Sequence, residues 1–192
     1  MRYVVFDLET QNIFTDVGSS DPSALDISVA SAYDSETDSY TTVTVDEIEK
    51  LWPIFERADA LVGYNSNHFD IPLLNKYYPG DLTKIRSIDL MVEVQKVLGR
   101  RIRLQSLAEA TLKVGKSGNG LESVKWWNEG LYEKVREYCI QDVKITRDLY
   151  DIALTKGSLK YKDLKDIRDI KVDTSKWQIE PEPSAFTHTL GL

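Results

Sequence analysis

Cysteine and histidine are scarce in this sequence. Cys139 is the only cysteine, and the two histidines, His68 and His188, lie far apart in the chain. One thiol cannot form an internal disulfide, which is typical of a reducing compartment, so we expect a cytoplasmic location. So few thiol and imidazole groups also argue against a zinc site of the usual ligands. We expect Cys139 to be a small buried side chain, because no histidine-based arrangement lies near it to activate the thiol.

Long apolar runs are absent as well. No segment approaches the roughly 20 apolar residues that a membrane helix needs. The N-terminus enters a strand-like segment directly, without the basic region, apolar region and cleavage site of a secretory signal. We therefore expect no membrane partner.

Basic residues are fewer than acidic ones: 24 lysines and arginines against 31 aspartates and glutamates give a net charge of −7. Nucleic-acid-binding proteins usually carry a basic face, so this total argues mildly against one. Binding depends on local patches, however, and bound metal ions would offset several carboxylates. The densest basic stretch is RRIR at 100–103, followed by Lys113 and Lys116. It is either a solvated helix end with its loop or a patch that faces phosphate groups.

The 192 residues, of which 42% are hydrophobic, suffice for one domain with a sizeable core. The polar stretch DSETDS predicts a hairpin between the second and third strands. Strands that come first and then alternate with helices favour an α/β fold with a mixed sheet. The strands are expected at 2–8, 27–33, 40–45, 60–64 and 84–89. The helices are expected from about 46, from about 70, and at about 90–99, 104–113 and 131–154, with a flexible loop at 114–120.

Two carboxylates end the first strand in the stretch VVFDLET. Side chains alternate between the two faces of a strand, so Asp7 and Glu9 project from the same side, roughly 7 Å apart along the chain. Like charges at that distance raise each other's pKa and cost stability unless a positive group lies between them. The stretch therefore predicts a positively charged partner.

The long helix carries a third carboxylate, Asp142, in the middle of an otherwise apolar stripe. An ionised carboxylate on such a face is costly unless it is paired or bound to a metal. Tyr138, one turn earlier, presents its hydroxyl on the same side. A buried ion pair between Asp142 and an arginine or lysine is the alternative to a metal. The stripe consists of Leu131, Val135, Tyr138, Asp142, Ile145 and Leu149.

Asp70, in the stretch GYNSNHFD, is the fourth acidic position. With Pro72 two residues later, Asp70 is typical of a helix N-cap. Capping and metal binding are compatible, because a carboxylate has two oxygens. Asp89 also follows a strand, and we expect it to cap a helix, with an accessory role at the site.

Together these carboxylates come from a central strand, the start of a helix and the middle of a long helix. Hard oxygen ligands of this kind are what Mg²⁺ and Mn²⁺ prefer. The sequence therefore predicts a pair of divalent ions as the positive partner.

The stretches FDLET, GYNSNHFD and YCIQD resemble the three motifs of the DEDD exonuclease superfamily in its tyrosine subgroup. The resemblance is to the proofreading exonuclease domains of family B DNA polymerases and to related stand-alone exonucleases. It covers residues 1–154 in the right order. Glu137 stands where the histidine subgroup carries its histidine, which favours the tyrosine subgroup.

The resemblance implies an RNase H-like fold, with a mixed five-stranded sheet flanked by helices, and hydrolysis of the terminal phosphodiester by a two-metal mechanism. It assigns the first metal ion to Asp7, Glu9 and Asp142, with Asp7 bridging to a second ion and Asp70 helping through water. Tyr138 would orient the attacking water, because a phenol with a pKa of about 10 is a poor base at neutral pH.

The resemblance also places three residues, Thr10, Asn65 and Phe69, near the terminal nucleotide. For Phe69, stacking on a base and plain core packing both remain open.

We therefore expect a metal-dependent 3′→5′ exonuclease, with Mg²⁺ or Mn²⁺, that acts on single-stranded 3′ ends, DNA more than RNA, in a pathway such as DNA repair. The alternatives are an exoribonuclease, a catalytically silent RNase H-like module that binds nucleic acid or protein, and a phosphodiesterase for small nucleotides. Residues 1–154 form the exonuclease domain in this interpretation. Residues 155–192 are a C-terminal extension, either a hairpin or a tail that binds a protein partner.

Overall fold

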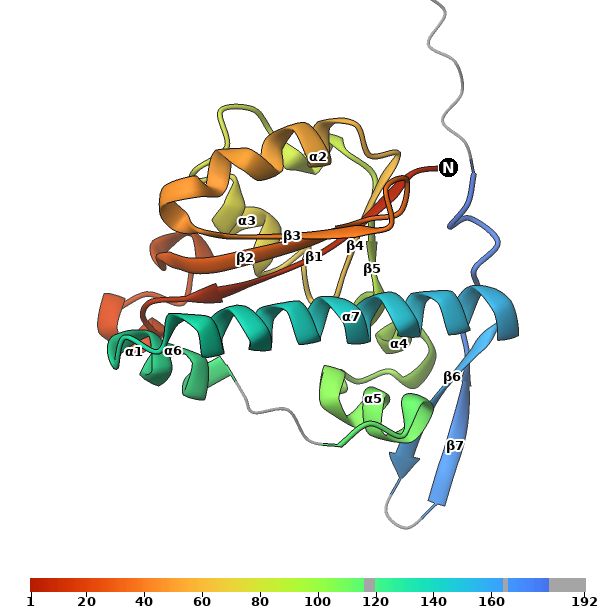
Figure 1. Cartoon of the computed structure of the whole chain (residues 1–192). Coiled ribbons are helices and arrows are strands. Elements are labelled where there is room, and N and C mark those ends of the chain that lie inside the picture. The colour runs from red at the N-terminus through yellow and green to blue at the C-terminus, as the bar shows by residue number, and fades with distance from the viewer. Residues whose placement is uncertain (116–119, 164–165, 180–192) are drawn as a thin grey trace, which may run out of the picture.

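A five-stranded mixed sheet is the centre of the computed structural model, which describes residues 1–115, 120–163 and 166–179. The spatial order is β3-β2-β1-β4-β5 (Figure 1). β2 runs antiparallel to both of its neighbours, whereas β4 and β5 run parallel to β1. The α/β fold with a mixed five-stranded sheet is thereby confirmed. The strands are β1 (Tyr3–Thr10), β2 (Ile27–Asp34), β3 (Ser39–Thr44), β4 (Ala60–Gly63) and β5 (Ser87–Asp89).

Helices cover both faces of this sheet (Figure 1). One face packs against α4, α5 and α7, and the other against η2, α2 and α3. None of the helices in the described part of the chain has both the length and the apolar character needed to cross a membrane. The helices are α1 (Phe14–Val17), α2 (Trp52–Glu56), α3 (Asp70–Leu74), α4 (Leu90–Leu98), α5 (Leu104–Leu112), α6 (Gly120–Asn128) and α7 (Tyr132–Lys156), with short 3₁₀ turns η1 (Pro22–Ala24), η2 (Val45–Leu51) and η3 (Leu82–Lys84).

The central strand β1 shows why the sheet can carry polar groups on one side. Val4, Phe6 and Leu8 belong to the core on the side of α2 and α3. The alternate positions face α7, and there Val5 is buried in the second core. Asp7 and Glu9 continue the same side of the strand, where α7 packs against β1 and β2.

The long helix α7 departs from the expected stripe at its first position. Leu131 is 46% exposed and only precedes the helix, as its N-cap residue. Its backbone, with φ −85° and ψ 53°, is not helical, so its side chain does not follow the helical spacing. The placement of Leu131 on the inward stripe was wrong, whereas Val135, Ile145 and Leu149 are buried.

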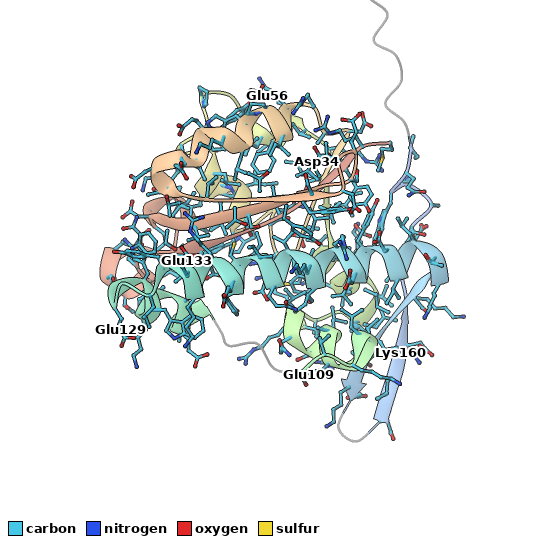
Figure 2. The ribbon with its side chains drawn as sticks, in the orientation of Figure 1. Asp34, Glu56, Glu109, Glu129, Glu133 and Lys160 are labelled. Carbon is cyan, nitrogen blue, oxygen red and sulfur yellow. The ribbon has the colours of Figure 1, made fainter. Side chains whose placement is uncertain are left out.

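The chain beyond residue 157 forms a hairpin, β6 (Ser158–Asp163) with β7 (Asp166–Lys171). It packs into the same core as α4, α5 and α7, and Trp177 stacks on Tyr150 at 5.3 Å between ring centroids. Figure 2 shows Glu109 of α5 and Lys160 of β6 on the same side of the molecule. Of the two interpretations of residues 155–192, a hairpin is therefore supported by the antiparallel strands observed at 158–163 and 166–171. The partner-binding tail stays a prediction, because residues 180–192 lie outside the described residues, as do 116–119 of the expected loop.

Candidate active site

Three carboxylates from two distant parts of the chain meet at the end of β1. Asp7 and Glu9 come from the strand, and Asp142 comes from the middle of α7. One oxygen of each lies within 4.8 Å of the others. The structure therefore brings Asp7 and Glu9 together with Asp142, each on the side of its strand or helix that the periodicity predicts.

These acidic groups have no basic counterpart in the described part of the chain. Every lysine or arginine ion pair found there, within 4.0 Å, involves other acids. The alternative of a buried ion pair for Asp142 is therefore not realised among these residues. A buried cluster of carboxylates without a cation is costly, and a divalent ion would neutralise it.

The electrostatics of the cluster follow from burial and mutual repulsion. Burial raises the pKa of Asp7 well above its ordinary value, and the charges of Asp70, Asp142 and Glu9 raise it further. Burial, against a hydrogen bond from Ser123, raises the pKa of Glu9 to about 8. Burial also raises the pKa of Asp142 to about 6, an effect that the hydroxyl of Tyr138 opposes. The oxygen-only donor set fits Mg²⁺ or Mn²⁺.

Asp70 lies beside the cluster but outside the group of three. It is buried, at 4% exposure, and burial followed by the charge of Asp89 raises its pKa to about 8, which the backbone of Leu8 opposes. The prediction that Asp70 caps the helix was wrong by one position. Phe69 is the N-cap of α3, without a side-chain cap, and Asp70 is its first helical residue. Its carboxylate accepts hydrogen bonds from its own backbone N–H, at the start of α3, and from the backbone of Leu8 at the end of β1.

The eight residues expected to bind metal, act in catalysis or bind substrate line one cavity of about 650 Å³, whereas Asp89, expected in an accessory role, is not among its lining residues. The eight are Asp7, Glu9, Thr10, Asn65, Phe69, Asp70, Tyr138 and Asp142. A common cavity establishes their proximity, and their roles in binding and catalysis stay predictions. A volume of this size is in the range that holds a small ligand.

The three residues expected near a nucleotide differ in how they are held. The Thr10 hydroxyl donates to the carbonyl of Asn12 at 2.8 Å, which fixes the turn after β1. Asn65 has a left-handed backbone, with φ 64°, and its buried Oδ1 has no hydrogen-bond partner among the described residues. Phe69 packs on the core beside α3 and also lines the cavity, where Phe14 meets it edge-on at 6.1 Å.

Sequence reasoning missed the contact that Ser123 makes with the site. Ser123 is fully buried on α6 and donates a hydrogen bond to Glu9 Oε2. Arg103, which was noted only as part of a basic stretch, is the one lysine or arginine that lines the cavity in the described part of the chain. The spacing of the basic residues in the sequence does not indicate whether Arg103 faces the solvent or the cavity.

Cys139 is buried, as expected, and its thiol lies 3.4 Å from the carbonyl oxygen of Asp7. Burial and the surrounding carboxylates raise its pKa well above the ordinary value, so the thiol is a poor nucleophile. Asp89 caps α4, as expected, through the N–H groups of Met91 and Val92.

Comparison with known proteins agrees with this architecture. Of the solved structures, 93 chains match. One is the family B DNA polymerase of the hyperthermophilic archaeon Pyrobaculum calidifontis, at 20% identity and a TM-score of 0.63. The match covers 80% of this chain but only 24% of the polymerase chain, so this chain spans about a quarter of its length. No curated protein matches. The model of the RNase_H superfamily matches residues 4–154, and the chain therefore belongs to the RNase H superfamily, with its nuclease-type fold.

Proposed function

We propose that this protein is a metal-dependent 3′→5′ exonuclease that hydrolyses the terminal phosphodiester of single-stranded nucleic acid, with DNA preferred to RNA. The observation that carries the proposal is the convergence of Asp7, Glu9 and Asp142 within 4.8 Å at the floor of one cavity. The order of the three motifs along the chain supports an exonuclease of the tyrosine subgroup over other nucleases of the superfamily.

The four acidic residues would hold two divalent ions, Mg²⁺ or Mn²⁺. Asp7, Glu9 and Asp142 offer the first set of oxygens, and Asp70 lies close enough to raise the pKa of Asp7. Two ions bound there would activate a water molecule at neutral pH and stabilise the charge that develops on the leaving 3′ oxygen.

In this proposal Tyr138 orients the attacking water. Burial and the charge of Asp142 raise the pKa of Tyr138 far above its ordinary value, so the phenol stays protonated at neutral pH. A protonated phenol cannot act as a general base, but it can hold a water molecule by a hydrogen bond. Trp126 packs edge-on against the Tyr138 ring at 5.9 Å and limits its rotation.

The remaining cavity lining is suited to a nucleotide. Phe14 and Phe69 offer aromatic surface on which a base can stack. Asn65 also lines the cavity, and in this proposal it lies near the terminal nucleotide. Arg103 supplies one positive charge for a phosphate of the strand.

The proposal is tested with DNA and RNA oligonucleotides of one sequence, labelled at the 5′ end and either free or blocked at the 3′ end. With Mg²⁺ or Mn²⁺ we expect stepwise shortening from free 3′ ends, faster on DNA, and none in EDTA. Asp142→Ala is the control for a contaminating nuclease and should be inactive. Cleavage inside a 3′-blocked strand would overturn the proposal, and faster shortening of RNA would favour an exoribonuclease.

A phosphodiesterase for small nucleotides is the second candidate, because the chain has a net charge of −7 and, among the described residues, a single arginine lines its cavity. Such an enzyme would hydrolyse a dinucleotide as fast as an oligonucleotide, at a rate that does not depend on salt. The same assay, with a dinucleotide and a salt series added, separates the two.

A further inference from the structure

Ser123 is the one side chain seen to hydrogen-bond Glu9 in the described part of the chain. Its Oγ contacts Glu9 Oε2 and also lies 2.8 Å from the carbonyl oxygen of Gly120 in its own helix. Ser123 is fully buried and Glu9 is 7% exposed, so water does not readily replace this contact. A serine in this position orients the Glu9 carboxyl group.

Helix α6, which carries Ser123, is fixed by contacts of its own. It packs against α7 and β1. Trp126, one turn after Ser123, meets the ring of Tyr138 on α7 at 5.9 Å and 77° between ring planes. The ammonium of Lys134 lies 4.0 Å from the centre of the Trp126 ring. The position of the Ser123 hydroxyl is therefore set by the packing of the helix and not by the contact with Glu9 alone.

The geometry of Glu9 needs such support. Its pairing partner in the ladder is Val29 of β2, and the register of β1 shifts directly after it, between Glu9 and Thr10. Glutamate has three side-chain torsions and loses more freedom than aspartate when it is held in one position. Asp7 and Asp142 stand on the regular parts of β1 and α7. Glu9 is thus the member of the group whose orientation depends most on an outside contact.

We propose that Ser123 is a positioning residue for the metal centre, which holds the Glu9 carboxylate in the orientation that binds a divalent ion together with Asp7 and Asp142. This inference rests on the proposed function. Groups that orient metal ligands typically contribute 10–100-fold to metal affinity or activity. Ser123 would act through Glu9 and would not touch the nucleic acid.

The experiment compares the full-length wild type with Ser123→Ala and a matched control, Ser28→Ala. Ser28 is also a fully buried serine, but its hydroxyl has no hydrogen-bond partner among the described residues. Mn²⁺ binding is measured by calorimetry without substrate. We expect about 10-fold or greater weakening in Ser123→Ala and no change in Ser28→Ala. If the alanine variant does not fold, Ser123→Cys takes its place. Cysteine nearly conserves the side-chain volume but is a weaker hydrogen-bond donor, so this variant should also weaken Mn²⁺ binding.

Activity on a 3′-free oligonucleotide gives the second readout. In Ser123→Ala the Mn²⁺ concentration for half-maximal rate should rise with the dissociation constant, while KM for the oligonucleotide at saturating Mn²⁺ stays unchanged. Equal Mn²⁺ affinity of wild type, Ser123→Ala and Ser123→Cys would overturn the inference, as would a change confined to KM for the oligonucleotide. Absence of Mn²⁺ binding in the wild type would instead overturn the proposed function, so the two failures are distinguishable.

Discussion

Asp89 holds the backbone of Asn65 in place: its Oδ1 accepts a hydrogen bond from the Asn65 N–H at 2.8 Å. Its other oxygen accepts from the N–H of Asn67 at 3.0 Å. The same carboxylate caps α4 through Met91 and Val92. A single buried group at the end of β5 thus fixes both a helix start and the left-handed turn that presents Asn65 to the cavity.

Asp89→Ala should lower both stability and activity, because four backbone N–H groups lose their acceptor. Loss of a cap and of the loop contacts together should reduce the free energy of unfolding by about 2–3 kcal/mol. Urea denaturation gives the value. Asp81→Ala is the matched control, since Asp81 caps only the short η3, through a hydrogen bond to the N–H of Thr83 that is exposed to solvent. This account of the loop would be contradicted if Asp89→Ala lowered the free energy of unfolding no more than Asp81→Ala does.

The metal-free protein should lose stability as the pH rises. The pKa of Glu9 and of Asp70 is raised to about 8 and that of Asp142 to about 6 in the folded chain. The unfolded chain releases these protons near pH 4 to 4.5, so between that pH and about 8 the folded chain binds more protons. Stability is therefore full at the lower end of this window, falls through it and levels off above it.

Thermal unfolding in EDTA at pH 5.5, 7 and 8.5 checks this expectation, and the melting temperature should fall at each step of the series. Adding Mn²⁺ at pH 8.5 should restore the stability, because the ions bind only the folded state. A melting temperature that rises with pH in EDTA would contradict the interpretation of the acidic cluster.

Asp142→Asn should make the metal-free protein more stable and the enzyme inactive. The amide keeps the shape of the side chain and removes one charge from a group of carboxylates without a basic partner in the described residues. At pH 8 in EDTA we expect a gain of about 1–2 kcal/mol in the free energy of unfolding. Asp148→Asn, on the same helix but paired with Arg147, serves as the control and should show no gain. A less stable Asp142→Asn protein would argue against repulsion in the cluster.

Arg103→Ala should weaken the binding of nucleic acid. The OH of Tyr64 donates to the carbonyl of the neighbouring Ile102 at 2.6 Å, which fixes the segment that brings Arg103 to the cavity. We expect KM for an oligonucleotide to rise several-fold, kcat to change little, and the slope of log KM against log salt to fall by about 1. Arg101→Ala removes an arginine that is also exposed but is not among the residues that line the cavity. Equal effects of the two substitutions would contradict a specific role for Arg103.

The parts of the site that the sequence predicted are those set by local periodicity. Asp7 and Glu9 lie on the same side of β1 because side chains alternate along a strand. Val135 and Ile145 are buried, and their spacing identifies the side of α7 that faces the core. Prediction failed at Leu131, where the helix had not yet begun. The helix start near Asp70 was misplaced by one residue, because Phe69 takes the N-cap position and Asp70 is already helical.

The parts that could not be predicted depend on packing between distant segments. Ser123 and Glu9 are 114 residues apart in sequence, and the serine lies on a short helix, with no motif of its own. Arg103 lines the cavity beside Ile102, whose carbonyl oxygen accepts a hydrogen bond from Tyr64, a residue that directly follows β4. Neither relationship leaves a periodic signal in the sequence.

Anomalous diffraction from a crystal soaked in Mn²⁺ at pH 8 tests the metal centre most directly. The account predicts a manganese peak bounded by Asp7, Glu9 and Asp142 in the wild type, and its loss in Asp142→Ala. A fully soaked wild-type crystal with no peak at these three residues, from protein that degrades oligonucleotides in the same Mn²⁺ concentration, would contradict it.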